Sequence, residues 1–168
     1  MSAPTIKQKL RDKGLLLLAR REHSYQEMQR KLRYAATQYA AGSTEEIEIE
    51  SSDHDEDIDA ILEDFKKRGW LSEERFAEQV VHARQGKFGS MRIAHELREK
   101  GVNEAVVDTV MGEVKDGEYD NAVAICQRKY GAPPKDRNEW AKQARFLQSR
   151  GFGFDIIKRV LNRSDDAE

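Results

Sequence analysis

The sequence predicts an all-α protein, and three observations lead to that prediction. Proline, which breaks helices, occurs only at positions 4, 133 and 134 of the 168 residues. Apolar residues recur at helical spacing, and 36% charged against 38% hydrophobic residues favours thin helical layers over a thick core. The chain also resembles itself at a shift of 50 residues. We therefore expect three tandem three-helix repeats that form an elongated helical array.

The internal repeat is clearest between the second and third copies. Each copy reads as a helix, a cationic residue, a glycine, an apolar residue and a further helix. Glycine suits the residue after a helix because it adopts the left-handed conformation without a Cβ clash, and a preceding cation favours the helix C-terminus. A chance similarity within one irregular bundle is the alternative. The aligned pairs are Leu97 and Leu147, Lys100 and Arg150, Gly101 and Gly151, Val102 and Phe152, Val106–Val107 and Ile156–Ile157, and Val110–Met111 and Val160–Leu161.

A first copy lies at the N-terminus, where SYQEMQRKL (24–32) matches SMRIAHEL (90–97). Ser24 and Ser90 are predicted N-caps, since a hydroxyl oxygen can accept from an amide of the first turn. The partner helix contains Ile61–Leu62 and ends at Gly69. This copy holds about 20 additional residues, and we expect the acidic insertion, about 43–57, to be a solvated loop.

Each copy also has a leading helix, expected at about 6–21, 73–86 (capped by Ser72) and 119–130. Units this small cannot bury their apolar stripes alone, so neighbouring repeats must stack. The predicted boundaries are 1–71 for repeat 1, 72–115 for repeat 2 and 116–163 for repeat 3, with a disordered tail at 164–168.

Charge is strongly segregated along the chain. Residues 1–42 carry nine Lys and Arg against three acids, residues 43–64 carry eleven acids and no Lys or Arg, and residues 65–168 carry twenty Lys and Arg against seventeen acids. A basic body of this kind suits a polyanion or an acidic protein groove. The acidic insertion is either a solvated linker or a segment that lies across the basic residues and competes with DNA.

No pattern indicates an enzyme, a cofactor or a metal site. Cys126 is the only cysteine, which excludes an internal disulfide, and its apolar neighbours predict burial rather than nucleophilic reactivity. The four histidines are scattered, and no phosphate-binding glycine loop is present. The polar N-terminus and the absence of an apolar stretch long enough to cross a membrane argue against membrane contact. The single cysteine favours a reducing cytoplasm, and we expect a monomeric binding protein.

Four stretches carry a resemblance to a known family: ARREHSYQEMQRKL (19–32), RGWLSEERFAEQVVHAR (68–84), RIAHELREKGV (92–102) and RFLQSRGFGFDIIKRVL (145–161). In this order they resemble the RecX family, regulators of the RecA recombinase. The resemblance implies that the array of three-helix repeats is elongated and curved and that it binds RecA filaments. It also implies inhibition of RecA ATPase, strand exchange and co-protease activity, and weak non-specific affinity for single- and double-stranded DNA. Two departures are the long acidic insertion and Met28, where leucine is commoner.

Basic residues, with one loop aromatic, are the candidate contacts for RecA or DNA. If they share a face, they form a charged track for phosphates or acidic side chains. The alternative is scattered surface charges paired with glutamates, as in Glu27–Lys31 and Glu96–Lys100. A helix-turn-helix DNA-binding regulator that reads DNA with residues 90–100, or a scaffold with no nucleic-acid role, also remains open. The candidates are Arg20, Arg21, Lys31, Arg33, Lys66, Lys67, Arg68, Arg84, Lys87, Phe88, Arg92, Arg98, Lys100, Arg145, Arg150, Lys158 and Arg159.

Overall fold

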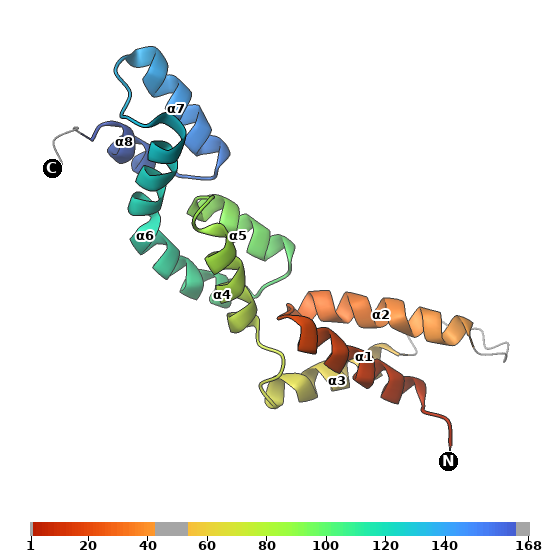
Figure 1. Cartoon of the computed structure of the whole chain (residues 1–168). Coiled ribbons are helices and arrows are strands. Elements are labelled where there is room, and N and C mark those ends of the chain that lie inside the picture. Colours follow the sequence, from red (N-terminus) through yellow and green to blue (C-terminus); the bar gives the residue numbers. More distant parts are fainter. Residues whose placement is uncertain (1, 43–53, 164–168) are drawn as a thin grey trace. The chain divides into compact units, whose positions relative to one another are not determined.

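The computed structural model describes residues 2–42 and 54–163, which form eight helices and no strand (Figure 1). The all-α prediction is confirmed. Contacts divide the chain into unit 1, which runs to Phe76 and includes Lys100–Val102, and unit 2, which holds Ala77–Glu99 and the residues from Asn103 onward. The helices are α1 (Ile6–Arg20), α2 (Tyr25–Ala41), α3 (Asp55–Lys67), α4 (Glu73–Arg84), α5 (Ser90–Glu99), α6 (Glu104–Tyr130), α7 (Arg137–Ser149) and α8 (Phe154–Leu161).

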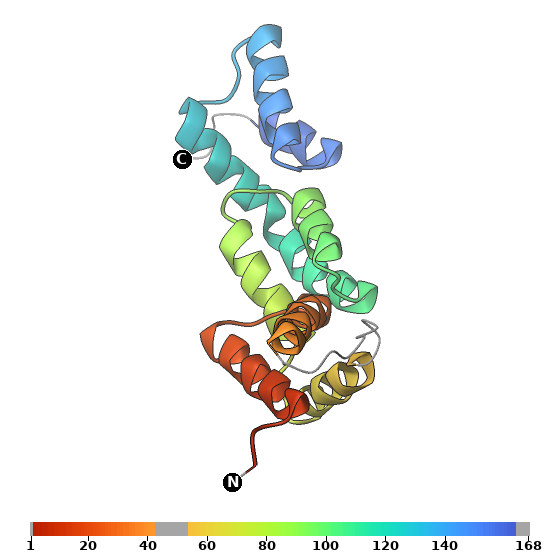
Figure 2. The same ribbon diagram turned by 90° about the vertical axis from the view of Figure 1, so that its right-hand side faces the viewer.

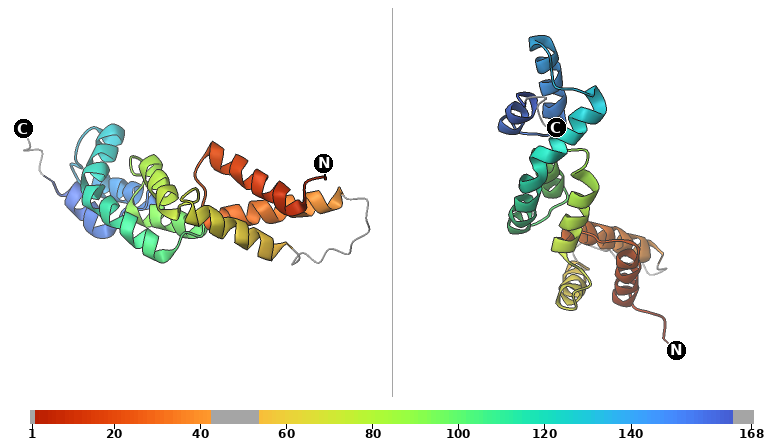
Figure 3. Two further views of the ribbon diagram at one scale, coloured as in Figure 1. Left: turned by 90° about the horizontal axis from the view of Figure 1, so that it is seen from below. Right: turned by 60° about the vertical axis from the view of Figure 1, so that its left-hand side comes forward.

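In unit 1, α1, α2 and α3 pack side by side around one apolar core (Figure 3, left). Leu10, Leu32 and Phe65 come from the three helices in turn, and each is fully buried. Their helical spacing with the other buried residues gives every helix one apolar stripe and leaves the opposite side to charged residues. This core fixes the three helices against one another.

Helix α2 begins where the sequence predicts. The Ser24 Oγ accepts a hydrogen bond from the Glu27 amide at 3.1 Å, which confirms Ser24 as an N-cap. The same hydroxyl donates to the Lys100 carbonyl at 2.6 Å, so it also holds the turn before Gly101. The N-cap of α2 thereby anchors a turn that lies 76 residues away in the sequence.

The predicted loop at 43–57 extends too far, because Asp55 already begins α3. Three acids in the first turn of α3 favour a helix start, since they lie next to the unpaired amides and the positive end of the helix dipole. Ile58 is buried in the core, and Asp55 accepts from Arg33 at 2.8 Å. The rest of the predicted loop, 43–53, and the predicted tail at 164–168 lie outside the described residues.

In unit 2, α5 packs on the first half of α6, while α7 and α8 pack with its second half (Figure 2). The helix predicted at 119–130 is not separate, because α6 runs from Glu104 to Tyr130 without interruption. Gly112 and Gly117 interrupt neither its hydrogen bonding nor its apolar stripe, since glycine costs a helix only about 1 kcal/mol and Val114 is buried between them. One helix therefore ends the second repeat and begins the third.

The residues aligned by the 50-residue shift have matching environments. Leu97 and Leu147 are both fully buried, and most of the aligned apolar residues after each turn are buried too. Val106 and its counterpart Ile156 are both half-buried. Gly101 has φ +75° and Gly151 has φ +87°, which is the left-handed conformation predicted for both. The internal alignment therefore identified equivalent structural positions.

The Gly151 turn is held against the start of α5 by backbone hydrogen bonds. The Gly89 amide donates to the Arg150 carbonyl at 2.7 Å, and the Met91 amide donates to the Gly151 carbonyl at 3.1 Å. Ser90 is the first residue of α5 and not its N-cap, which corrects the prediction. Its amide donates instead to the buried Glu118 carboxylate at 2.9 Å, so α6 supplies the capping group.

Candidate binding surface

Seven of the predicted contact cations form ion pairs within the protein. Such pairs are the outcome expected if these residues are ordinary solvated surface charges. Among them, Lys31 lies 3.7 Å from Glu27, as the helical spacing predicted. The seven pairs are Arg21 with Glu27, Lys31 with Glu27, Arg33 with Asp55, Lys66 with Glu63, Arg68 with Asp64, Arg84 with Glu96 and Arg98 with Glu104.

Eight other predicted cations have no carboxylate partner in the parts of the chain that the structure describes. No described carboxylate neutralises their charge, so within these residues it is available to an anionic partner. Lys100 belongs to neither set; its Nζ lies 6.0 Å from the centre of the Phe76 ring. The eight are Arg20, Lys67, Lys87, Arg92, Arg145, Arg150, Lys158 and Arg159.

Unit 2 brings Phe88, Arg92 and Arg150 together. The guanidinium carbon of Arg92 lies 4.1 Å from the centre of the Phe88 ring, and that of Arg150 lies 5.4 Å from the same centre. Arg150 is also 5.3 Å from the centre of the Phe146 ring, above which the Lys129 Nζ lies at 4.7 Å. We call Phe88, Arg92, Lys129, Phe146 and Arg150 the cation–aromatic ladder.

The ladder is held by tertiary contacts of the loop before α5. Phe88 follows α4, Arg92 lies in α5, and Arg150 is the C-cap residue of α7, so the Gly89 and Gly151 hydrogen bonds bring the three together. Arg128 donates from its Nη2 to the Gly86 carbonyl at 2.8 Å and so holds the same loop to α6. The positions of the ladder residues therefore depend on the contact between this loop and the Gly151 turn.

The ladder can bind an anion. Cation–π contacts at exposed sites contribute about 0.5–1 kcal/mol each, and they position a guanidinium without neutralising it. A guanidinium offers five N–H donors in a planar fork that matches phosphate or carboxylate oxygens. Apart from a long 3.4 Å contact from Arg92 to the Ser149 carbonyl, the guanidinium groups of Arg92 and Arg150 donate to no other described residue.

The structure does not bring all eight unpaired cations into the ladder. Lys158 lies over Phe154 at 5.6 Å and Arg159 over Tyr119 at 4.7 Å, each apart from Phe88. Sequence reasoning missed Phe146 as a functional residue, because it precedes the fully buried Leu147 and reads as part of the same apolar stripe. Lys129 was not among the candidate contacts, because the sequence gives no signal for its contact with the Phe146 ring.

Unit 1 has a related arrangement in which the charge is neutralised. Arg68 lies 5.1 Å and Arg11 5.9 Å from the centre of the Trp70 ring, but both donate to Asp64. These hydrogen bonds hold the pKa of the Asp64 carboxyl below its usual value. Trp70 packs on Phe65 at 5.8 Å, as expected for a residue after a helix-ending glycine, yet remains 42% exposed.

A second polar cluster in unit 1 surrounds His23. Burial lowers the pKa of this histidine, since desolvation penalises the charged ring. Its Nδ1 lies 2.9 Å from the Arg21 carbonyl, and the Lys31 Nζ lies 3.4 Å from its Nε2, which fits a neutral ring that donates from Nδ1 and accepts at Nε2. Burial alone would raise the pKa of Glu27, but its hydrogen bond from Arg21 brings the pKa below the usual value.

Other kinds of site are not indicated within the described ranges. No group of three or more histidine, cysteine or acidic side chains there is arranged to hold a metal ion. None of the described helices is both long and apolar enough to span a bilayer. Cys126 is buried as predicted, and burial raises the pKa of its thiol, which makes it a poor nucleophile.

Comparison with known proteins decides the family. Residues 72–111 match the second three-helix domain of RecX, and residues 116–161 match the third. Regulatory protein RecX from Leptothrix cholodnii is 38% identical over 93% of this chain and 89% of its own length. The chain belongs to the RecX family. Regulatory protein RecX from Ralstonia pickettii is 32% identical over 94% of this chain and 89% of its own length.

Solved RecX structures share the fold. The crystal structure of RecX from Lactobacillus salivarius covers 93% of this chain and 94% of its own, with a TM-score of 0.74 at 18% identity. A further crystal structure of a regulatory protein RecX covers 94% of this chain and 74% of its own, with a TM-score of 0.71 at 18% identity. The RecX relatives are named as regulatory proteins and not as enzymes.

Proposed function

We propose that this protein binds RecA filaments on DNA and restrains them, lowering RecA ATPase, strand exchange and co-protease activity in DNA repair, recombination and the SOS response. Membership of the RecX family is the observation that carries the proposal. The protein acts as a cytoplasmic monomer and a binding protein, without catalysis. Its affinity for single- and double-stranded DNA is weak and independent of sequence, because basic side chains contact the phosphates and not the bases.

We propose that the cation–aromatic ladder contributes most to this binding, through the predicted contacts Phe88, Arg92 and Arg150. An arginine that already pairs with a carboxylate must give up that partner to bind a filament, so its net gain is small. Arg92 and Arg150 have no such partner among the described residues and are already positioned by Phe88. The same reasoning places Arg98, which hydrogen-bonds to Glu104 at 2.6 Å, among the weaker contacts.

The test is the DNA-dependent ATPase rate of RecA with this protein at substoichiometric ratios. The wild-type chain should lower the rate, and Arg92→Ala should raise the concentration needed for half inhibition by roughly tenfold, since a charge-assisted contact contributes about 1.5 kcal/mol or more. Arg98→Ala is the matched control, because it removes the same charge from the same helix. An unchanged ATPase rate with wild-type protein would refute the function; equal effects of the two variants would refute the role of the ladder.

DNA binding measured without RecA distinguishes the proposed function from the helix-turn-helix alternative. Ile93, Ala94 and Leu97 of α5 are buried, and Arg98 is paired with Glu104, which leaves α5 few groups for reading bases. Anisotropy measured with DNAs of different sequence should therefore show uniform binding that weakens with salt. If Arg92 contacts a phosphate, Arg92→Ala should reduce the salt slope by about 1. A strongly preferred sequence would favour the alternative.

A further inference from the structure

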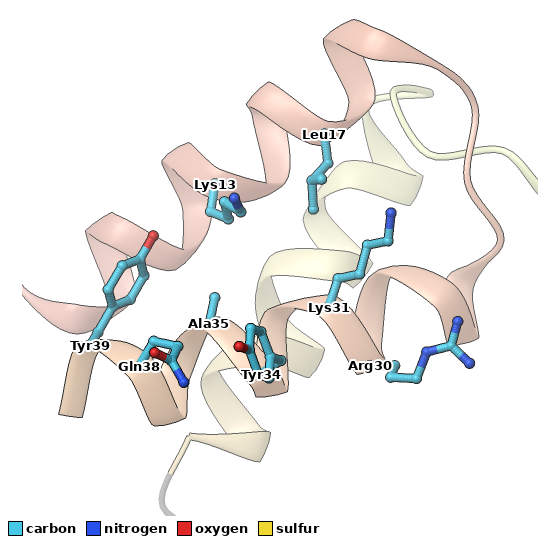
Figure 4. Close-up of a pocket in the computed structure, with 8 residues that line it drawn as sticks. All are labelled: Lys13, Leu17, Arg30, Lys31, Tyr34, Ala35, Gln38 and Tyr39. Atoms are coloured by element: carbon cyan, nitrogen blue, oxygen red, sulfur yellow. The ribbon is translucent and has the colours of Figure 1, made fainter. Parts of the chain in front are cut away.

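Unit 1 contains a groove of about 510 Å³ between α1 and α2, and Lys31 is the one residue lining it that was among the predicted contacts. Figure 4 shows Lys13 and Leu17 projecting from α1 toward Ala35 and Lys31 of α2, with Tyr34 at its edge. Leu17 and Ala35 are almost fully buried and form its floor. The groove is therefore apolar below and open to solvent above.

Large apolar side chains remain exposed beside the groove. Tyr34 lines it and is 68% exposed, and Leu16 on α1 is 63% exposed. Leu16 does not line the groove, but it is a neighbour of the lining residue Lys13, three residues away on the surface of α1. Exposed apolar residues next to an apolar groove are typical of a protein-binding surface.

The charge at the rim is positive. Lys13, Arg30 and Lys31 line the groove, and no acidic residue does. Lys31 lies 3.7 Å from Glu27 and is partly balanced, whereas Lys13 and Arg30 have no carboxylate partner in residues 2–42 and 54–163. Lysine and arginine at the border of an apolar groove favour a ligand that has carboxylates flanking its apolar side chains.

We propose that the groove binds an acidic amphipathic segment of a partner protein. The aliphatic side chains of the segment pack on Leu17, Ala35 and Tyr34, and its carboxylates contact Lys13 and Arg30. Docking of an amphipathic helix into a groove between two helices is a recurring mode of recognition. The apolar floor favours a peptide over nucleic acid, which needs a charged path for its backbone. The inference does not depend on the proposed function.

The test uses the full-length chain and a fluorescein-labelled peptide helix with leucines at helical spacing and glutamates elsewhere. Anisotropy should show saturable binding, and the Lys13→Glu and Arg30→Glu double variant should weaken it at least tenfold. A double variant with Lys115→Glu and Lys142→Glu, both exposed in unit 2, makes the same charge change away from the groove and should keep the affinity. Circular dichroism confirms that the variants fold, and Tyr34→Ala should weaken binding without a change in charge.

Several outcomes would overturn the proposal. These are the absence of saturable binding at the highest soluble protein concentration, equal binding of the peptide with lysines in place of its glutamates, and equal affinity of the groove variant and its control. If the Lys13→Glu and Arg30→Glu variant lost binding of single-stranded DNA while its control kept it, the groove would instead be a nucleic-acid site. A dimer in sedimentation equilibrium that this variant abolishes would identify a second copy as the occupant. Tighter peptide binding after deletion of residues 43–53 would identify that segment of the chain as the occupant.

Discussion

Gly151→Ala gives a direct test of how the third-repeat turn packs on α5. The new Cβ would lie 2.4 Å from the Arg92 Cβ and 2.7 Å from the Arg92 amide nitrogen. Both distances are far below an ordinary contact, and the second partner is backbone. The turn and α5 must therefore separate, which strains the Met91-to-Gly151 and Gly89-to-Arg150 hydrogen bonds of 3.1 and 2.7 Å.

The expected loss of unfolding free energy has two parts. Placing a Cβ at φ +87° costs about 1–2 kcal/mol, because the left-handed conformation brings Cβ close to the following carbonyl oxygen. Weakening two backbone hydrogen bonds adds about 0.5–1.5 kcal/mol each. We therefore expect Gly151→Ala to destabilise the protein by about 2–5 kcal/mol.

Gly131→Ala is the matched control. Gly131 lies in the same unit at φ +77°, but a Cβ there would meet no atom within 4 Å, so only the conformational cost of about 1–2 kcal/mol applies. Urea titrations of both variants, followed by circular dichroism, measure the difference. Equal losses at the two positions would show that the contact with Arg92 contributes nothing and would refute the reasoning.

Three further predictions concern buried polar groups. The pKa of His23 is lowered in the folded state, so its contribution to stability is complete above the unfolded value of 6.5 and is lost as the pH falls toward the folded value. His23→Gln should therefore flatten this part of the pH–stability profile in urea titrations. An unchanged profile would contradict the lowered pKa. Glu118→Ala removes the acceptor of the Ser90 amide and should lower the free energy of unfolding by about 1–3 kcal/mol in urea titrations. Glu113 is exposed on the same helix, so Glu113→Ala should lower it little. Equal losses would count against the capping role of Glu118. Cys126 should react with a thiol reagent only as fast as unit 2 opens, and a rate in native protein like that of a free thiol would show that it is accessible.

The sequence alone predicted an all-α chain, the glycine turns and many of the residues that face inward. Leu97 and Leu147 are buried at equivalent positions, and Gly101 and Gly151 have the left-handed conformation that the turn pattern required. These features are local: a helical stripe depends on spacing within one helix, and a positive φ depends on the absence of a Cβ at one residue. An internal alignment is therefore enough to find them.

Tertiary structure decided which charges are available. Arg92 and Arg98 lie on one helix and look equivalent in sequence, but Arg98 hydrogen-bonds to Glu104 while Arg92 stacks on Phe88. Arg150 and Phe146 join the same cluster from a helix more than 40 residues away in the sequence. Whether a surface cation is neutralised depends on which side chains the fold brings within a few ångströms, and that distance is not encoded by sequence spacing.

The start of α5 and the continuity of α6 were decided in the same way. Ser90 has the residue type of an N-cap, but the buried Glu118 carboxylate already accepts its amide, so the helix begins at Ser90 itself. Gly112 and Gly117 suggest a break that does not occur, because buried Val114 continues the apolar stripe between them. The local preferences of individual residues for or against a helix amount to about 1 kcal/mol. They set the ends of a helix only where tertiary packing contributes less, and here the free energy of burial is larger.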